Sequence, residues 1–418
     1  MLLDVLERCV LTRADTKSII GTAGTRAILE SIAVQGVDIP AVAIGSINAS
    51  NVQRVLHQTS SSTHPHAKLS GIAVVSAIVA SPDPQSAARE LRKRIDSAYS
   101  TFYSRSPQTT PLPIDLSTLV SQVPFVTRKH VLTNPLCHNM TNLVVQNFAA
   151  NVCLATGSSP IMSNNGLEAA DLASLRGALV INMGTVTPDI LSNYLIAMHA
   201  YNSLPTPGSI VFDPVGGGAT SVRRAAIKQL LAGGFFDCIK GNEGEIKAVS
   251  DPFPGPSSQG RQQQQRGVDS GPSTTTPLQK ATLIKSLAQR ERCIVLMTGP
   301  VDYLSDGTCT LAISNGHPLL GKITGSGCAL GSIVASYLAV HKEDKLLAVL
   351  AAILHYEIAA ERAARKAEGP GSFLPAFLDQ LYVITQAAEK GDDTWLNDMV
   401  KVEFVGPRTE HAFCPGLG

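Results

Sequence analysis

The chain has 418 residues, of which 44% are hydrophobic and 16% are charged, so it is long enough for two or three domains with substantial cores. Its 34 basic and 33 acidic residues leave a formal net charge of +1. That balance argues against a nucleic-acid-binding surface or a polybasic membrane surface, and it is compatible with an enzyme for small molecules.

The cysteines and the N-terminal segment indicate the cytosol. The eight cysteines form no Cys-x-x-Cys pair, which favours a reducing compartment without a disulfide framework or a zinc site. Asp4 and Glu7 lie where a signal peptide needs a basic start. The sequence also contains no uncharged apolar segment of about 18 residues. We therefore expect a cytoplasmic protein with no membrane or nucleic-acid partner.

Residues 1–105 alternate between strand and helix patterns. Apolar segments at 41–44 and 71–78 are typical of buried strands. The helices that we expect in this region are at 25–33, 48–56 and 83–98. Repeated strand–helix units of this kind predict a parallel sheet.

Residues 128–405 show the same alternation over a longer stretch. We expect buried strands at 178–183, 209–215, 236–240 and 293–297, and helices at 142–155, 328–341, 345–367 and 374–389. Residues 303–313, with Asp306-Gly307 at the bend, predict a hairpin. Together these features predict a doubly wound α/β sheet with an antiparallel addition.

Two segments interrupt this pattern. Residues 106–127 are rich in Pro, Ser and Thr, which is typical of a linker. Residues 251–277 have low complexity and almost no apolar content, so they cannot bury enough surface to offset the entropy lost on ordering. We expect residues 251–277 to be a disordered surface insertion.

The turn at 324–328 is the most informative local motif. Two glycines and two hydroxyl residues lead into an apolar helix, whose first N–H groups and dipole favour an anion such as phosphate. Cys328 falls in the first helical turn, where a thiolate is stabilised and can act as a base. The alternative is a helix entry that only needs glycines, with Cys328 packing behind the loop.

Asp213 and Glu245 each follow a predicted strand, where ligands bind in open α/β sheets. Two carboxylates in that position can hold Mg²⁺, which bridges nucleotide phosphates. Two structural alternatives remain open. Asp213 could cap the turn at Pro214, and Glu245 could be an acid in the first turn of a helix.

Many motifs in order give residues 130–395 a family resemblance. They lie at 135–142, 157–162, 182–185, 213–216, 241–246, 297–299, 324–328 and 369–373. This part of the chain resembles hydroxyethylthiazole kinases, which have the ribokinase-like fold. The resemblance implies transfer of the γ-phosphoryl group of ATP to 4-methyl-5-(2-hydroxyethyl)thiazole, with Mg²⁺ as cofactor. It also implies a homo-oligomer based on trimers, with active sites at subunit interfaces.

The resemblance also assigns roles to single residues. Cys328 is the implied catalytic base, and Asp213 with Glu245 the implied metal site. The remaining assignments are Met162 and Gly325 for the thiazole, and Asn142, Lys240, Thr298 and Thr324 for ATP. Met162 could instead be a core filler, and Asn142 a helix N-cap.

The first domain resembles the C-terminal end of thiamine-phosphate synthase, a (β/α)₈ barrel, at 16–24, 42–47 and 74–78. The order of the two domains resembles the fused thiamine-biosynthesis enzymes of fungi. The resemblance implies a thiazole-phosphate site at Thr16, Lys17, Gly45, Ser46, Val75 and Ser76.

A complete barrel of this kind takes roughly 200–250 residues. We therefore expect residues 1–105 to be a partial, N-terminally truncated barrel of doubtful synthase activity. Three alternatives stay open: a working bifunctional enzyme whose missing half belongs to a longer transcript, a non-catalytic oligomeric scaffold, and a different ribokinase-like kinase that acts on a pyrimidine or a sugar.

Overall fold

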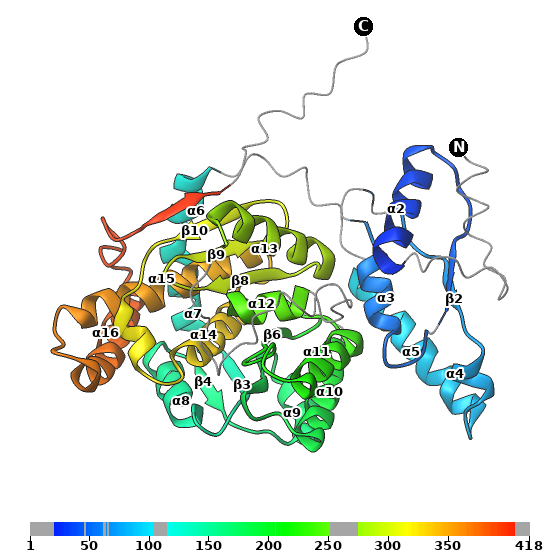
Figure 1. The fold of residues 1–418 in the computed structure, drawn as a ribbon, viewed down its shortest axis with the longest axis horizontal. Coiled ribbons are helices and arrows are strands. Elements are labelled where there is room, and N and C mark those ends of the chain that lie inside the picture. The colour runs from blue at the N-terminus through cyan, green and yellow to red at the C-terminus, as the bar shows by residue number, and fades with distance from the viewer. Residues whose placement is uncertain are drawn as a thin grey trace, which may run out of the picture. The chain divides into compact units, whose positions relative to one another are not determined.

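The computed structural model contains two compact units (Figure 1). The N-terminal unit comprises Met1–Pro113, Leu195–Pro207 and Gln229–Phe235, and the sheet unit comprises Ile114–Tyr194, Gly208–Lys228 and Phe236–Gly418. The structure describes residues 21–45, 47–61, 64, 67–102, 115–204, 206–250 and 275–405. Each unit is considered separately below.

The N-terminal unit contains the parallel strand pair that the sequence predicts. Strands β1 (Val42–Ile44) and β2 (Gly71–Ala73) pair with Ala43 opposite Ile72. The helices of this unit are α2 (Gly21–Val34), α3 (Val52–Thr59), α4 (Ser76–Val79) and α5 (Pro84–Phe102). The predicted strand over 71–78 is wrong beyond Ala73, because β1 offers only three residues to pair with.

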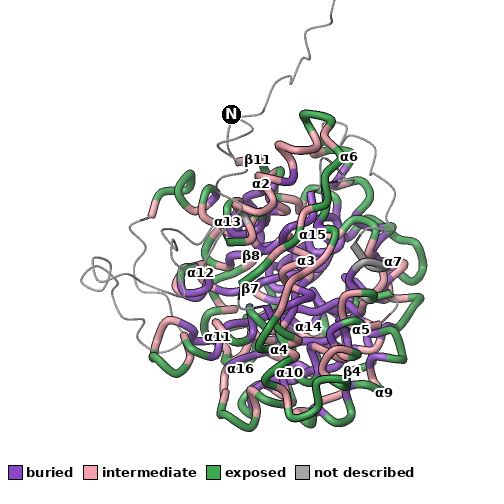
Figure 2. The backbone as a smooth tube through the Cα atoms, turned by 90° about the vertical axis from the view of Figure 1, so that its right-hand side faces the viewer, coloured by how far each residue is buried: buried purple, intermediate pink, exposed green. Residues whose placement is uncertain are grey.

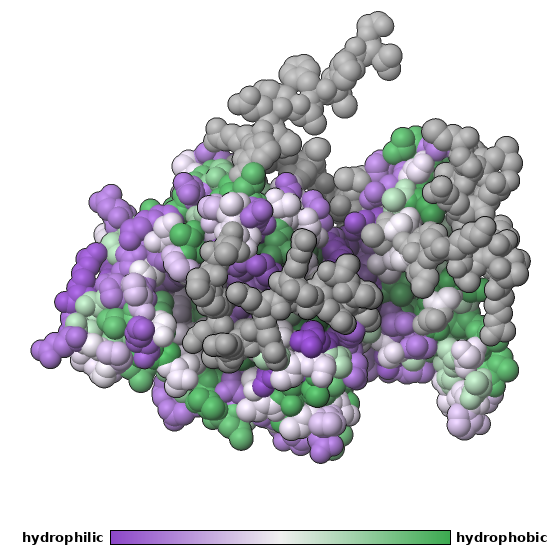
Figure 3. Space-filling model, in the orientation of Figure 1, coloured by the Kyte–Doolittle hydropathy of each residue, from purple (hydrophilic) through white to green (hydrophobic). Residues whose placement is uncertain are grey.

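Apolar side chains of this small sheet remain at the surface. Val42 and Ile44 on β1 are 56% and 62% exposed, and Val75 and Val79 are 69% and 73% exposed. Figure 3 shows hydrophobic residues on the surface of this unit. Two parallel strands cannot close a barrel, so the prediction of a buried strand at 41–44 is wrong: Val42 and Ile44 of β1 are exposed.

The sheet unit is built on a sheet that has nine strands among the described residues. The strands are β3 (Leu136–Met140), β4 (Ser159–Ile161), β5 (Ala178–Asn182), β6 (Ser209–Asp213), β7 (Cys238–Asn242), β8 (Ile294–Thr298), β9 (Asp302–Ser305), β10 (Thr310–Ile313) and β11 (Val402–Phe404). Their order is β11-β10-β9-β8-β7-β6-β5-β3-β4. Strands β3 to β8 are parallel, and β9, β10 and β11 add antiparallel pairs, which confirms the doubly wound layout and the hairpin.

Helices cover both faces of this sheet. They are α6 (Leu116–Ser121), α7 (Val123–Thr133), α8 (Gln146–Ala155), α9 (Ala169–Ser174), α10 (Pro188–Asn202), α11 (Ser221–Gly233), α12 (Glu243–Ser250), α13 (Pro277–Glu291), α14 (Ser326–Val340), α15 (Lys345–Ala364) and α16 (Pro370–Lys390), with 3₁₀ turns at Gly166–Glu168, Met183–Thr185 and Pro318–Lys322. Parallel crossovers are right-handed, so the helices that connect β5 to β8 lie on one face and α14 on the other. Among the described residues, no helix has the length and apolar character needed to cross a membrane.

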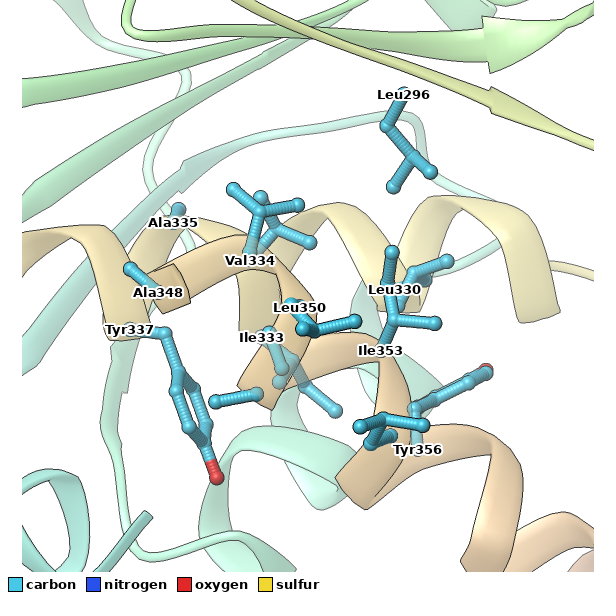
Figure 4. Close-up of a cluster of buried hydrophobic side chains, with 14 of the residues drawn as sticks. Leu296, Leu330, Ile333, Val334, Ala335, Tyr337, Ala348, Leu350, Ile353 and Tyr356 are labelled. Carbon is cyan, nitrogen blue, oxygen red and sulfur yellow. The ribbon is translucent and has the colours of Figure 1, made fainter. Parts of the chain in front are cut away.

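Helix α14 is the centre of the core. It packs against β3, β5, β6 and β7 on one side and against α7, α8 and α15 on the other. Figure 4 shows Leu330, Ile333 and Val334 of α14 beside Leu350 and Ile353 of α15. All five side chains are at most 4% exposed, and buried backbone runs through the middle of this unit in Figure 2. The start of α14 is therefore held by a rigid core.

Part of the expected linker belongs to this core. Residues 116–127 form α6 and the beginning of α7, and Leu119, Val123 and Val126 are buried. Asp115 caps α6 by accepting the backbone N–H of Thr118. The linker prediction is wrong here because apolar side chains at helical spacing lie among the Ser and Thr residues. Residues 106–114 lie outside the described part of the chain.

The end of the expected insertion is also ordered. Thr276 and Gln279 form a capping box at the start of α13, so residues 275–277 are not disordered. Residues 251–274 lie outside the described part of the chain. On one side of them the Ser250 carbonyl accepts from Arg290 at 2.5 Å, and on the other Thr275 donates to Glu243 at 2.6 Å.

We predict that deleting residues 252–264 changes the melting temperature and the activity little. The two flanking ends keep their own contacts, and changing the length of a surface loop alters the closure free energy by only about 0.6 kcal/mol per doubling. The check is a thermal melt of the deletion variant beside the wild type. A large loss of melting temperature would contradict the prediction.

Two buried histidines, His130 and His355, contact Tyr337 of α14. His130 stacks on Tyr337 at 4.1 Å, and the Tyr337 hydroxyl lies 2.8 Å from Nδ1 of His355. Burial, with repulsion from His355, lowers the pKa of His130 to about 3, and burial lowers the pKa of His355 to about 4. Both rings are therefore neutral at neutral pH and serve as structural residues.

This burial predicts acid sensitivity. Below a pH of about 6.5 the unfolded chain binds protons that the folded chain excludes, so stability falls as the pH drops toward 4, by up to about 1.4 kcal/mol per pH unit for each histidine. His130→Gln should make the slope shallower by the contribution of that histidine, up to about 1.4 kcal/mol per pH unit. The exposed His317→Gln is the control and should leave it unchanged. Denaturant unfolding followed through Trp395, the one tryptophan of the chain, measures the slope. An equal slope in His130→Gln and the wild type would contradict the prediction.

Candidate functional site

Polar side chains gather where the central parallel strands end. Asp213 ends β6 and pairs in register with Asn182, which ends β5. Lys240 lies on the next strand, β7. Because the carboxyl ends of parallel strands meet at one edge of the sheet, these side chains converge there.

Asp213 is the buried centre of this group. Its Oδ1 accepts from Nζ of Lys240 at 3.2 Å, and its Oδ2 accepts from Nδ2 of Asn182 at 2.8 Å. Burial raises the pKa of Asp213, and attraction to Lys240 opposes that rise. Burial by itself would lower the pKa of Lys240, but attraction to Asp213 and Cys328 raises it above the ordinary value. The lysine is thus held as a cation beside the carboxylate.

Two amides connect Asp213 to Cys328. A carboxylate can only accept, so Asn182 presents its Nδ2 to Asp213 and its Oδ1 to Asn142, whose Nδ2 lies 3.0 Å away. The same Nδ2 of Asn142 lies 3.6 Å from Sγ of Cys328. Helix α8 begins only at Gln146, so the N-cap alternative for Asn142 is wrong; its Oδ1 accepts from the N–H of Val144 in the preceding turn.

The glycine turn places Cys328 at the start of α14. Gly325 is the N-cap and has φ +81°, which favours glycine. A Cβ at this position would also clash with Cγ2 of Val145. Tyr356 of α15 donates to the Ser326 carbonyl at 2.8 Å and holds the turn against the core. The first N–H groups of α14 have no partner within the helix, as an anion site requires.

The expected stabilisation of a Cys328 thiolate is wrong for the ligand-free chain. Burial and the negative charge of Asp213 raise the pKa of Cys328 to about 11, although Lys240, Asn182 and Asn142 oppose the rise. The thiol form therefore prevails at pH 7.

Glu245 is an acid in the first turn of a helix, which is the structural alternative considered for it. It lies in the first turn of α12, where its Oε2 accepts the N–H of Asn242 at 2.7 Å. Its Oε1 accepts the N–H of Gly216, in the loop after Asp213, at 2.8 Å. Burial and the charge of Asp213 raise the pKa of Glu245 to about 7. Glu245 therefore ties α12 to the loop that follows β6.

The other predicted residues of the sheet unit lie around this group at different distances. Thr298 ends β8 and pairs in register with Asn242, close to Glu245. Thr324 is exposed in the turn before α14. Met162 follows the edge strand β4 and packs against the core, so it is three strands away from β6. The structure thus brings together Asn142, Asp213, Lys240, Glu245 and Cys328, with Thr324 and Gly325 in the turn before Cys328 and Met162 at the edge strand.

The N-terminal unit has a pocket of ≈ 560 Å³ at the ends of its two strands. Gly45, Val75 and Ser76 line this pocket, with Ile44 and Asn48 beside them. Thr16, Lys17 and Ser46 lie outside the described residues. The structure thus places three of the six expected thiazole-phosphate residues around one cavity.

Sequence reasoning assigned no role to Asn182 or Arg223. Asn182 ends a strand, as Asp213 does, so the same positional signal could have found it. Arg223 lies inside a helix and carries no such signal. Among the described residues there is no group of three or more His, Cys, Asp or Glu side chains placed to hold a metal ion.

All of the comparisons with known proteins described below match the sheet unit. The model of the hydroxyethylthiazole kinase family matches residues 128–387. A probable thiamine biosynthetic bifunctional enzyme of Schizosaccharomyces pombe (strain 972 / ATCC 24843) is 39% identical over 386 residues, which cover 90% of this chain and 70% of that protein. The hydroxyethylthiazole kinase of Moorella thermoacetica (strain ATCC 39073 / JCM 9320) is 42% identical over 248 residues, 59% of this chain and 87% of that protein.

A solved structure supports the same assignment. The hydroxyethylthiazole kinase of Pyrococcus horikoshii OT3 aligns with a TM-score of 0.58 and 33% identity, over 68% of this chain and 100% of that one. The sheet unit thus has the ribokinase-like α/β fold. On these matches, the chain belongs to the hydroxyethylthiazole kinase family.

Proposed function

We propose that the chain transfers the γ-phosphoryl group of ATP to the hydroxyl of 4-methyl-5-(2-hydroxyethyl)thiazole, as a step in thiamine biosynthesis. The observation that carries this proposal is the convergence of Asp213, Lys240, Asn142 and Cys328 at the start of α14. The names of the related kinases supply the substrate. Phosphoryl transfer mainly needs positioning and charge stabilisation, which such a group provides.

Different residues of the site supply the positioning and the charge stabilisation. The first N–H groups of α14 hold the transferred phosphoryl group, because their partial positive charge faces the anion. Lys240 adds a full positive charge, and Asp213 fixes its ammonium. Thr298 and Thr324 contact the nucleotide, whereas Met162 and Gly325 contact the thiazole. Lys240 therefore acts on the phosphates as a single compact charge, because lysine lacks the two parallel N–H groups with which an arginine binds a phosphate.

Mg²⁺ fits this site through its water ligands. Each oxygen of Asp213 and of Glu245 already accepts one hydrogen bond within the chain and keeps a further lone pair. Magnesium retains several waters and usually binds through one or two carboxylates together with substrate phosphates. When bound, it would neutralise charge on the phosphates. We assign Asp213 and Glu245 to hold the hydrated ion.

Cys328 is the proposed base for the substrate hydroxyl. In the ligand-free chain its thiol is protonated, since burial raises its pKa to about 11. The positive charges next to it and the N–H of Asn142 favour the thiolate, so they work in the direction that a base requires. The alternative, in which the thiol only packs behind the loop, predicts a different result in the mutants below.

We predict that Cys328→Ser lowers kcat by about 10²–10⁴-fold while the affinity for ATP changes little, because serine is a poor base at neutral pH. Cys328→Asp should retain clear activity, since a carboxylate can accept the proton. The measurement is steady-state phosphorylation of the thiazole by the purified chain, with a sugar and a pyrimidine alcohol as alternative acceptors.

Three outcomes would count against this assignment. A kcat for Cys328→Ser close to that of the wild type would make the thiol structural. An Asp variant as inactive as the Ser variant would mean that the thiol does not accept a proton. A wild-type chain that phosphorylates none of the acceptors would favour the non-catalytic scaffold.

The second candidate activity is condensation of thiazole phosphate with hydroxymethylpyrimidine diphosphate to thiamine phosphate. Two observations favour it: the related protein named as bifunctional matches 90% of this chain, and a pocket lies at Gly45, Val75 and Ser76. Against it, Val42 and Ile44 of the two-stranded sheet are exposed rather than enclosed in a barrel. We propose that the N-terminal unit is a synthase remnant with little activity by itself.

We predict that the full-length chain forms thiamine phosphate far more slowly than a complete synthase. Ser76→Asp should abolish any residual turnover, because it places a negative charge beside the phosphate-binding amides. Thiazole phosphorylation by the same variant is the internal control and should be unchanged. Turnover comparable to a complete synthase, abolished by Ser76→Asp, would show a working second site.

We also propose a homo-oligomer based on trimers, with small molecules as the other partners, and a cytosolic location. The six cysteines within the described residues are free, which supports a reducing compartment. Sedimentation analysis of the purified chain measures the oligomeric state.

A further inference from the structure

One arginine joins the two loops that flank Asp213. Arg223 lies near the start of α11. Its Nη1 donates to the Met183 carbonyl at 2.7 Å and to the Val215 carbonyl at 2.6 Å, and its Nη2 donates to the Gly184 carbonyl at 2.7 Å. A single guanidinium thus binds three backbone carbonyls from two loops, those that follow β5 and β6.

The first of these loops is the turn Met183–Thr185, and it packs directly against Asn142. A Cβ on Gly184 would come 2.6 Å from Cβ of Asn142, so the two are in close contact. The side-chain oxygen of Asn182 accepts the N–H of Gly184 at 3.0 Å. Any displacement of this turn is therefore passed to Asn142 and Asn182, which lie between Cys328 and Asp213.

The second loop, after β6, connects Asp213 to Glu245. Gly216 has φ +65° and donates its N–H to Oε1 of Glu245. A Cβ on Gly216 would lie 3.4 Å from Nη1 of Arg223, so the guanidinium packs against this glycine. The position of Arg223 thus affects both carboxylates of the site without touching either.

We propose that Arg223 is a positioning residue for phosphoryl transfer, which fixes the loops after β5 and β6 so that Asn142, Asp213 and Glu245 keep the geometry that the nucleotide requires. This inference rests on the proposed kinase function. The guanidinium donates from two separate nitrogens that are held in one plane, and this spacing lets it reach carbonyls of both loops at once. Lysine, with one compact ammonium, cannot reproduce the arrangement.

The test compares Arg223→Lys with Arg224→Lys. Arg224 is the adjacent residue and donates to the Gly218 carbonyl at 2.8 Å, further along the same loop, which makes it a matched control. Kinetic constants for ATP and for the thiazole are measured separately, together with calorimetric titration of each protein with ATP and Mg²⁺. Thermal melts show whether each variant is folded at the assay temperature.

We expect Arg223→Lys to lower kcat/KM for ATP by roughly 10- to 100-fold, the scale of loss that small misplacements of a site produce. The ATP affinity should weaken in parallel, and KM for the thiazole and all constants of Arg224→Lys should stay within about twofold. If Arg223→Lys is poorly folded, Arg223→Gln, whose planar amide retains two donors, should show the same direction.

Other outcomes overturn the inference. Unchanged ATP constants in Arg223→Lys, equal losses in both arginine variants, or equal losses for ATP and thiazole that follow the melting temperature would each make Arg223 a general stabilising residue. A wild type that binds ATP but does not phosphorylate the thiazole contradicts the proposed function alone, because the binding comparison still decides the role of Arg223. A wild type that binds no ATP overturns both.

Discussion

The buried ion pair between Asp213 and Lys240 is the interaction on which the site depends. Asp213 is fully buried, and Lys240 is only 3% exposed. A charge in such a place is tolerated only when its hydrogen bonds are satisfied, and removing one partner of a buried pair typically costs about 3–5 kcal/mol. Lys240 and Asn182 satisfy one oxygen each, so the register of β5, β6 and β7 and the chemistry of the site are fixed by the same contacts.

Helix α14 joins the site to the core. Its first turn carries Gly325 and Cys328, whereas its remaining length packs between the sheet and α15. The hydrogen bond from Tyr356 to the Ser326 carbonyl connects the buried helix pair to the turn itself. The core therefore gives the anion-binding turn a fixed position, and a preorganised donor costs no rearrangement when charge develops.

Burial has opposite effects on the two charged groups that the proposed reaction needs, the Lys240 ammonium and the Cys328 thiolate. It strengthens the attraction between Lys240 and negative groups, because few water molecules screen it. It also opposes ionisation of Cys328 and raises the pKa of that thiol. The amides of Asn142 and Asn182 act against this effect, and Nδ2 of Asn142 lies 3.6 Å from Sγ of Cys328. The balance between these contributions decides whether Cys328 can be present as the thiolate, the form that accepts a proton.

The sequence by itself determined the α/β layout of both units and the approximate positions of the predicted strands. Local signals sufficed for this: apolar segments of strand length, the Asp306-Gly307 bend, the glycine turn before α14, and carboxylates after β6 and β7. The resemblance to hydroxyethylthiazole kinases came from motifs that are contiguous in the chain. Such features depend only on residues that are close together in the chain, so they can be recognised from the sequence alone.

Only the tertiary structure decided which side chains meet and how burial changes them. Asn182 and Arg223 act through partners 31 to 40 residues away, which no spacing rule connects to them. Residues 116–127 are ordered because the core of the sheet unit accepts their apolar side chains. The pKa of Cys328 rises because the folded chain excludes water from it. These properties arise from contacts between distant segments, and those contacts exist only once the sheet and α14 have packed.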